Sequence, residues 1–239
     1  MLRPHLHPVS LVMRQVLHAA SAPIDHVYFM EEGLTSLTAS AGEAAEVEVG
    51  LVGREGLVGT GVLLMTGATA VHRAFVQVPG SAYRMQSGTF RDALSQFESL
   101  RDGCLRYVQF MMVQTAQCAA CNARHGLPER LARWLLFSMN RIESDELPMT
   151  QEFLSYMLGV RRAGVSVVAN GLQSEGLIRQ SRGRIILLDR AGLEAKACVC
   201  YRLVEDSRAR IMEVPSEHKL GTVQYGRDCA LSGIDNLRS

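Results

Sequence analysis

The sequence predicts an α+β protein in which an antiparallel β-roll comes first, a long helix follows, and a small helical domain with a β-hairpin comes last. Three observations support this order. Short alternating apolar segments fill the first hundred positions, an uncharged stretch runs from Tyr107 to Ala123, and two short amphipathic patterns joined by a glycine turn lie within residues 150–176. The predicted units are residues 1–100, 101–125, 126–202 and a disordered tail of 203–239.

The composition is that of a soluble globular protein with unevenly placed charge. Of the 239 residues 47% are apolar and the net charge is +1, but residues 122–202 hold twelve Lys and Arg against eight Asp and Glu. A basic domain beside a slightly acidic one is typical of a phosphate-contacting module attached to a sensor. Because no membrane-spanning stretch and no secretion signal are seen, we expect a cytoplasmic protein with reduced cysteines and no membrane partner.

The first hundred residues have the pattern of a jelly-roll-like β-roll. Alternating segments begin near Ile24, Leu34, Glu46, Val71 and Ala82, with turns rich in glycine, proline and acidic residues between them. Residues 1–22 show little pattern, and we expect a frayed terminus there. The glycine-rich stretch 53–64 lacks the Gly-Lys-Ser/Thr of a P-loop, so the sequence does not predict a nucleoside triphosphate site.

Residues from 101 to about 124 are predicted to form one long helix that pairs with a second copy of the chain. Apolar and small side chains recur at alternating spacings of three and four, as in the seam of a coiled coil. A helix with so long an uncharged stretch must also be buried against its own β-roll. The alternative is a core helix of a monomer. The predicted seam consists of Leu105, Val108, Met112, Thr115 and Ala119.

Cys118, Cys121 and His125 lie on one face of this helix. Together with Cys104 or with the segment Cys198–Cys200 they could complete a four-ligand site for zinc or an iron–sulfur cluster. Because Cys-x-x-Cys usually ligates a metal from a turn, we favour small buried side chains at a dimer seam and expect no metal or cofactor. A thiol- or metal-based redox sensor that controls DNA binding is the alternative.

Residues 150–176 are expected to form two helices joined by a tight turn. Thr150 can cap the first helix, and Gly159 can take the left-handed conformation that the turn needs. The second helix begins at Arg161 and Arg162, and its apolar positions recur at helical spacing. A strand, a basic glycine turn and a β-branched strand follow, and residues from Arg190 to about Arg202 are expected to form a closing helix. This order of elements is that of a winged helix-turn-helix. The alternative for the helix pair is a helical hairpin whose arginines are only solvated.

The chain resembles the Crp/Fnr transcription regulators. The likeness is carried by PERLARWLL at 128–136, by the helix pair and its flanks at 147–178, and by SRGRIILLDRAGLE at 181–194, with looser matches at 24–37 and 53–64. It implies a dimeric, sequence-specific DNA-binding regulator with a β-roll sensor similar to cyclic-nucleotide-binding domains and a long dimerisation helix. The implied partners are double-stranded DNA with an inverted-repeat operator, RNA polymerase for an activator, and an unknown small-molecule effector.

The predicted DNA contacts follow from side-chain chemistry and from this resemblance. Arginine can bond to guanine, and asparagine can bond to adenine, in the major groove. The acidic residue that commonly follows the base-contacting arginine is here Ala163, so the family's usual half-site is not transferred. The predicted base contacts are Arg161, Arg162, Ser166 and Asn170. The predicted backbone contacts are Thr150, Gln151, Arg179, Arg182 and Arg184.

The possible effector pocket differs from that of cyclic-nucleotide-binding relatives. By resemblance, such a site needs a glutamate for the ribose and an arginine for the cyclic phosphate. Thr60 stands at the first position, after Gly59, and His72 or Arg73 stands at the second. Because the charge-assisted bonds to a cyclic nucleotide are lost or weakened, we expect no binding of cAMP.

The sequence does not predict an enzyme. His26, Glu31, Glu32 and His72 could imitate the metal ligands of a cupin, but they lack its spacing of two histidines and a glutamate close together on neighbouring strands. No pairing of a nucleophile with a base is visible either.

Overall fold

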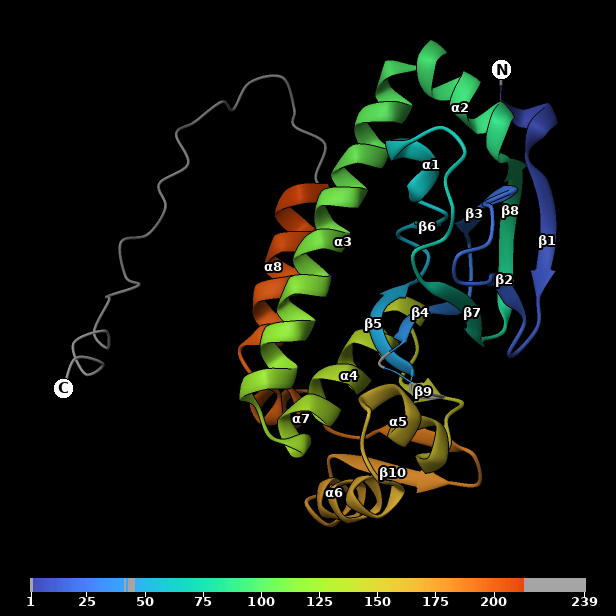
Figure 1. Ribbon diagram of the computed structural model, residues 1–239. Helices are drawn as coiled ribbons and strands as arrows, with labels where there is room; N and C mark the ends of the chain where they lie inside the picture. The colour runs from blue at the N-terminus through green and yellow to red at the C-terminus, as the bar shows by residue number, and fades with distance from the viewer. Residues whose placement is uncertain (1, 41, 43–45, 213–239) are drawn as a thin grey trace, which may run out of the picture.

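The computed structural model describes residues 2–40, 42 and 46–212 (Figure 1). The chain forms a β-roll, a long helix that runs beside the roll, and a smaller domain at one end of both. No helix within the described ranges is long and apolar enough to cross a membrane.

The β-roll is built from two four-stranded antiparallel sheets that share one apolar core. In spatial order the first sheet contains β1 (His7–Leu11), β8 (Gly80–Gln86), β3 (His26–Met30) and β6 (Leu57–Val58). The second contains β2 (Val16–His18), β7 (Arg73–Val78), β4 (Leu34–Ser40) and β5 (Glu46–Val52). Two short helical turns, η1 (Arg3–His5) and α1 (Gly61–Leu64), complete the roll. The predicted fold class is confirmed.

The prediction of a frayed terminus over residues 1–22 is wrong. Strand β1 pairs with β8 along its whole length, from His7 opposite Arg84 to Leu11 opposite Gly80. Only Leu11 of this edge strand is buried. A strand with a single buried side chain has no apolar alternation, so the sequence pattern could not reveal it.

Two helices follow the roll, α2 (Ser87–Gln96) and α3 (Glu98–Arg124). The long helix begins at Glu98, earlier than the start predicted just after Leu100, because the chain is extended at Phe97 (φ −120°, ψ 97°). The long helix is confirmed, and Tyr107, Phe110 and Gln114 on one of its faces are buried. Gln114 donates from Nε2 to the carbonyl of Leu51 at 3.2 Å, which joins α3 to β5.

The smaller domain contains helices and a three-stranded antiparallel sheet of order β10-β11-β9. Its elements are α4 (Leu127–Ile142), β9 (Glu146–Leu147), α5 (Gln151–Leu158), α6 (Arg162–Ser174), β10 (Ile178–Ser181), β11 (Arg184–Leu187) and α7 (Arg190–Lys196). In Figure 1 the helix pair α5 and α6 and the strand β10 lie together at the end of the molecule away from α2.

The C-terminal part of the described chain differs from the prediction. Instead of one closing helix from Arg190 to about Arg202, α7 ends at an extended Ala197 and a further helix, α8 (Cys200–Met212), runs alongside α3 (Figure 1). Val204 of α8 is fully buried. Residues 203–212 are therefore helical and not part of a disordered tail, because their apolar side chains have a helix to pack on. The rest of the predicted tail lies outside the described residues.

Candidate nucleic-acid interface

The first helix of the pair is held in the predicted way. The hydroxyl of Thr150 accepts a hydrogen bond from the backbone N–H of Phe153 at 3.2 Å and so caps α5. Gly159 ends α5 in the left-handed conformation, with φ 64°. Leu154 and Met157 are buried and anchor the helix. The turn therefore fixes the angle at which α6 leaves α5.

The second helix, α6, presents a mixed face to solvent. Val165, Ala169 and Leu172 are buried, whereas Arg162 and Asn170 are exposed. Arg161 is also exposed and occupies the cap position before the helix. Arginine side chains at the exposed N-terminal turn of an amphipathic helix suit the major groove.

Val167 is a residue that the sequence prediction missed. It is 73% exposed on α6, between Arg162 and Asn170 along the helix. Its position could have been read from helical spacing, because it lies two residues beyond the buried Val165. An exposed apolar side chain on this face can contact the methyl group of thymine.

Four polar side chains form a chain of hydrogen bonds across the base of the helix pair. The Ser166 hydroxyl donates to Gln151 Oε1, and Gln151 Nε2 donates to Gln180 Oε1 at 2.6 Å. Gln180 Nε2 in turn donates to Asn170 Oδ1 at 3.1 Å. Gln151, predicted to contact the DNA backbone, is thus engaged within the protein, and Gln180 is a member of this network that the sequence did not reveal.

The strands β10 and β11 form the predicted wing. Gly183 has a φ of 71° and lets the turn form, with the exposed Arg182 beside it. Arg184 is exposed but pairs with Glu146 of β9, at 2.7 Å between Nη1 and Oε1. Arg179 is exposed on β10. The wing is therefore basic, with one of its arginines partly neutralised.

The wing and the starts of α5 and α6 line an open hollow of about 350 Å³. Thr150, Arg162, Arg182 and Arg184 all line it. The structure thus brings predicted base-contacting and backbone-contacting residues to one concave, basic surface. A negatively charged polymer would be attracted to such a surface.

The predicted dimer seam remains accessible on α3. Met112 is 63% exposed and Leu105 is 44% exposed, and Ala119 is also exposed. Val108 and Thr115 are half-buried. Helix α8 packs on α3 without covering this seam, so an apolar stripe faces solvent.

The predicted effector residues separate into two places. Gly59, Thr60 and His72 line a cavity of about 210 Å³, together with His18 and Met111. Most of the remaining lining is aliphatic, and burial lowers the pKa of both His18 and His72. Burial therefore disfavours a positive charge on either imidazole, and no Lys or Arg of the described residues lines the cavity to bind a phosphate.

Arg73 does not line this cavity, contrary to the prediction. Its guanidinium pairs with Glu46, at 3.2 Å between Nη1 and Oε2, and lies 4.7 Å from the centre of the Phe75 ring. Because Arg73 begins β7 and Phe75 is two residues on, both side chains leave the strand on the same side. The arginine is thus directed to the junction with α5.

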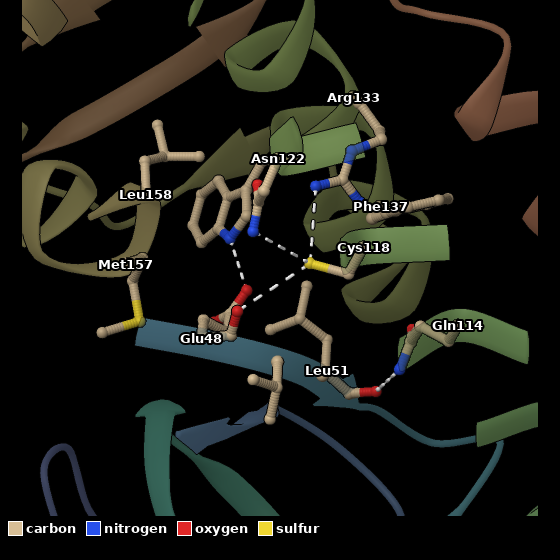
Figure 2. Close-up of a pocket in the computed structure, with 12 residues that line it drawn as sticks. Glu48, Leu51, Gln114, Cys118, Asn122, Arg133, Phe137, Met157 and Leu158 are labelled. Carbon is tan, nitrogen blue, oxygen red and sulfur yellow. Dashed lines mark hydrogen bonds between the residues drawn. The ribbon is translucent and has the colours of Figure 1, made fainter. Parts of the chain in front are cut away.

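A buried carboxyl joins the β-roll to α4 (Figure 2). Glu48 of β5 accepts from Trp134 Nε1 at 2.6 Å and from the Ser36 hydroxyl at 2.9 Å. Burial raises the pKa of Glu48 to about 7, although both hydrogen bonds act to lower it. The adjacent cavity is only about 20 Å³, so it has no room for an effector.

Cys118 and Cys121 of α3 contact different neighbours and do not share one site. The Cys118 thiol lies near the carbonyl oxygen of Glu48 at 3.8 Å, with Arg133 and Asn122 beside it (Figure 2). Cys121 and His125 instead face Cys198 and Cys200, and the four potential ligand atoms lie within 4.8 Å of one another. Among the described residues this is the only such group of at least three His, Cys, Asp or Glu, so the cupin-like set is not assembled.

Comparison with known proteins gives a consistent assignment of the smaller domain. Residues 129–196 match the model of the Crp-like helix-turn-helix domain. No match was found among curated protein sequences. Solved structures do match, and they share the fold of this chain at low sequence identity.

Three of these structures illustrate the likeness. FixK2 from Bradyrhizobium japonicum has a TM-score of 0.69 at 15% identity, over 81% of this chain and 98% of its own. TTHA1359, a CRP/FNR family regulator from Thermus thermophilus, has a TM-score of 0.63 at 22% identity, over 80% and 98%. The c-di-GMP responsive regulator CLP from Xanthomonas campestris has a TM-score of 0.62 at 17% identity, over 78% and 95%.

Proposed function

We propose that this chain, which carries a Crp-like helix-turn-helix domain on the fold of the Crp/Fnr regulators, is a sequence-specific DNA-binding transcription regulator that acts as a homodimer. The observation that carries the proposal is the concave basic surface where Arg162 of α6 faces the wing arginines. A recognition helix and a wing at one surface can grip a duplex in its groove and along its backbone together.

In this proposal α6 reads base edges. Arg161 and Arg162 bond to guanine at the start of the helix, and Asn170 bonds to a base two turns further on. Val167 adds contact with a thymine methyl group, and Ser166 reads a base or positions Gln151. Because Ala163 has no group that accepts from cytosine, the preferred half-site differs from that of relatives with an acidic residue there.

The remaining cations hold the backbone. Arg179, Arg182 and Arg184 contact phosphates, and the free N–H groups at the start of α5, beside Thr150, donate to a further phosphate. Arg184 contributes less than Arg182, because Glu146 already neutralises part of its charge. These contacts set the register of the helix and not the sequence preference.

The second copy pairs along the exposed seam of α3. Leu105 and Met112 are large apolar residues that a monomer would leave in water. A parallel pair of α3 helices would place two α6 helices on one side of the dimer, as an inverted-repeat operator requires.

The sensor of this regulator is proposed not to bind cAMP. The cavity of about 210 Å³ is lined, within the described part of the chain, by two histidines and mostly aliphatic groups, without Lys or Arg, and Arg73 lies outside it. An uncharged, largely apolar effector suits this lining better than a cyclic phosphate.

The test is a DNA-binding measurement by fluorescence anisotropy. Selection from a random duplex library first identifies the preferred site, and affinity for that site and for random DNA is then measured over a salt series, with and without cAMP. We expect a selected inverted repeat, a steep salt dependence and no response to cAMP.

Two arginine variants separate base reading from backbone contact. Arg162→Ala is expected to weaken specific binding by about 1–3 kcal/mol and to relax one base preference, whereas Arg182→Ala weakens all DNA equally and lowers the salt slope by about 1. Arg101→Ala, at the far end of α3, is the matched control and should change nothing. Equal losses on specific and random DNA for Arg162→Ala would refute the assignment, and no selected site would refute the function.

A further inference from the structure

A second candidate site lies where the end of α3 meets the segment between α7 and α8. Cys121 lies in the last turn of α3 and His125 caps it four residues later, so both side chains leave the helix on one side. Cys198 and Cys200 flank Val199, the last residue before α8. The structure thus joins two pairs of potential metal ligands that are more than seventy positions apart in the sequence.

The distances between the ligand atoms suit one metal ion. Cys121 Sγ and Cys198 Sγ are 3.4 Å apart, and Cys200 Sγ is 3.5 Å from His125 Nδ1. Zinc binds thiolate sulfur at about 2.3 Å in a tetrahedron, whose corners are then about 3.8 Å apart. A four-iron cluster would place a cube of iron and sulfide between its ligands and would hold them farther apart than the 4.8 Å limit found here.

We propose that Cys121, His125, Cys198 and Cys200 bind a single zinc ion. Three cysteines and one histidine form a closed ligand set typical of structural zinc sites, with no position left for a substrate. Sulfur and imidazole ligands also favour zinc over magnesium or calcium, which prefer oxygen.

The surroundings fit a buried complex of this charge. Cys121 and Cys200 are almost fully buried, and the three thiols form a small cluster apart from the main apolar core. Gln117 Nε2 donates to Cys200 Sγ at 3.0 Å, a bond that orients this sulfur.

Arg133 supplies a compensating charge. It is only 4% exposed, lies with Nη2 3.8 Å from the thiol of Cys118, one turn before Cys121 on α3, and leaves its Nε without a hydrogen-bond partner in the described part of the chain. Zinc with three thiolates and a neutral imidazole carries one net negative charge. A buried guanidinium beside it offsets that charge.

The proposed ion connects two parts of the chain across the start of α4. Cys121 and His125 precede Gly126, the N-cap of α4, whereas Cys198 and Cys200 follow α7. Zinc would therefore fasten α8 to α3 and limit the movement of the smaller domain against the long helix. Metal binding itself does not depend on the proposed DNA-binding function, so the experiment measures metal directly.

The test uses the full chain, purified without a polyhistidine tag or chelator and under reducing conditions. Elemental mass spectrometry should find about one zinc ion per chain. Replacement of zinc by Co²⁺ should give the visible bands of a tetrahedral site and the near-ultraviolet charge transfer of thiolate ligands.

Two cysteine variants make the comparison specific. The double variant Cys198→Ser, Cys200→Ser is expected to lose the zinc and the charge-transfer band. Cys118→Ser is the matched control, because Cys118 lies one turn before Cys121 on the same helix but outside the group, and it should retain both. Circular dichroism checks that each variant folds.

The results that would overturn the proposal are equally direct. They are a wild-type protein that stays metal-free after incubation with zinc, equal metal loss in Cys118→Ser, or a disulfide between Cys121 and Cys198 in the reduced preparation that excludes metal. Should the double variant not fold, alkylation of the wild type decides. Zinc must then protect Cys121, Cys198 and Cys200 from iodoacetamide, and an unchanged labelling pattern would reject the site.

Discussion

Replacing Glu48 by glutamine tests the junction between β5 and α4. The residue is 6% exposed and burial raises its pKa to about 7, against a usual value of 4.5. As the pH rises, the unfolded chain therefore loses this proton before the folded protein does. The folded protein binds more protons between these two values, so its stability falls as the pH increases from about 4.5 through 7.

The magnitude follows from the two pKa values. At about 1.4 kcal/mol per pKa unit, the difference between the folded and unfolded pKa values of Glu48 lowers the free energy of unfolding by roughly 3 kcal/mol by pH 8. That is a large part of the roughly 5–15 kcal/mol that stabilises a typical protein. Because glutamine cannot ionise, the free energy of unfolding of Glu48→Gln should exceed that of the wild type by about 3 kcal/mol at pH 8 and by less than about 1 kcal/mol at pH 5.

Urea unfolding followed by circular dichroism, at a series of pH values, measures this difference. Glu46→Gln is a matched control two residues away on β5. The hydrogen bond from Tyr156 lowers the pKa of Glu46, so its stabilising effect is present at neutral pH and is lost as the pH falls. At pH 8 the free energy of unfolding should therefore be higher than the wild-type value in Glu48→Gln and lower in Glu46→Gln. A Glu48→Gln difference that stays constant with pH would refute the reasoning.

Three further substitutions test the helix pair and the seam. Thr150→Ala removes the cap of α5 and should lower the free energy of unfolding by about 1 kcal/mol, measured with urea; no change would mean that the cap is not formed in solution. Gly159→Ala forces alanine to a φ of 64° and should lower the free energy of unfolding by about 1–2 kcal/mol in the same assay. An unchanged value would mean that the turn does not need this left-handed conformation. Met112→Lys should convert a dimer into folded monomers by light scattering, and a persistent dimer would place the interface elsewhere.

Local signals explain why the helix pair could be predicted from the sequence. Thr150 and Gly159 act within a few residues of their own positions, and the buried Val165, Ala169 and Leu172 repeat at the helical period. Such features depend little on the rest of the fold. The same holds for the long helix, whose uncharged stretch alone required burial.

Features that depend on distant parts of the chain were not predictable in this way. The direction of Arg73 is set by its pairing with Glu46, and the metal-ligand group needs α8 to return along α3. The sequence placed Cys118 with Cys121 because they share a helix face, yet the fold directs them to different neighbours. The edge strand β1 was missed because its partner supplies the backbone hydrogen bonds that define it.

The hydrogen-bond chain from Ser166 through Gln151 and Gln180 to Asn170 has a consequence for how an operator encodes its information. If Asn170 and Ser166 contact bases as proposed, a base that bonds to Asn170 Oδ1 competes with the hydrogen bond from Gln180 Nε2, and Gln180 and Gln151 connect this change to Ser166 one helical turn away. The two base positions would then be read as a unit. A weight matrix that scores each base separately should misjudge double changes at these positions, whereas a matrix that scores the two positions jointly should describe them.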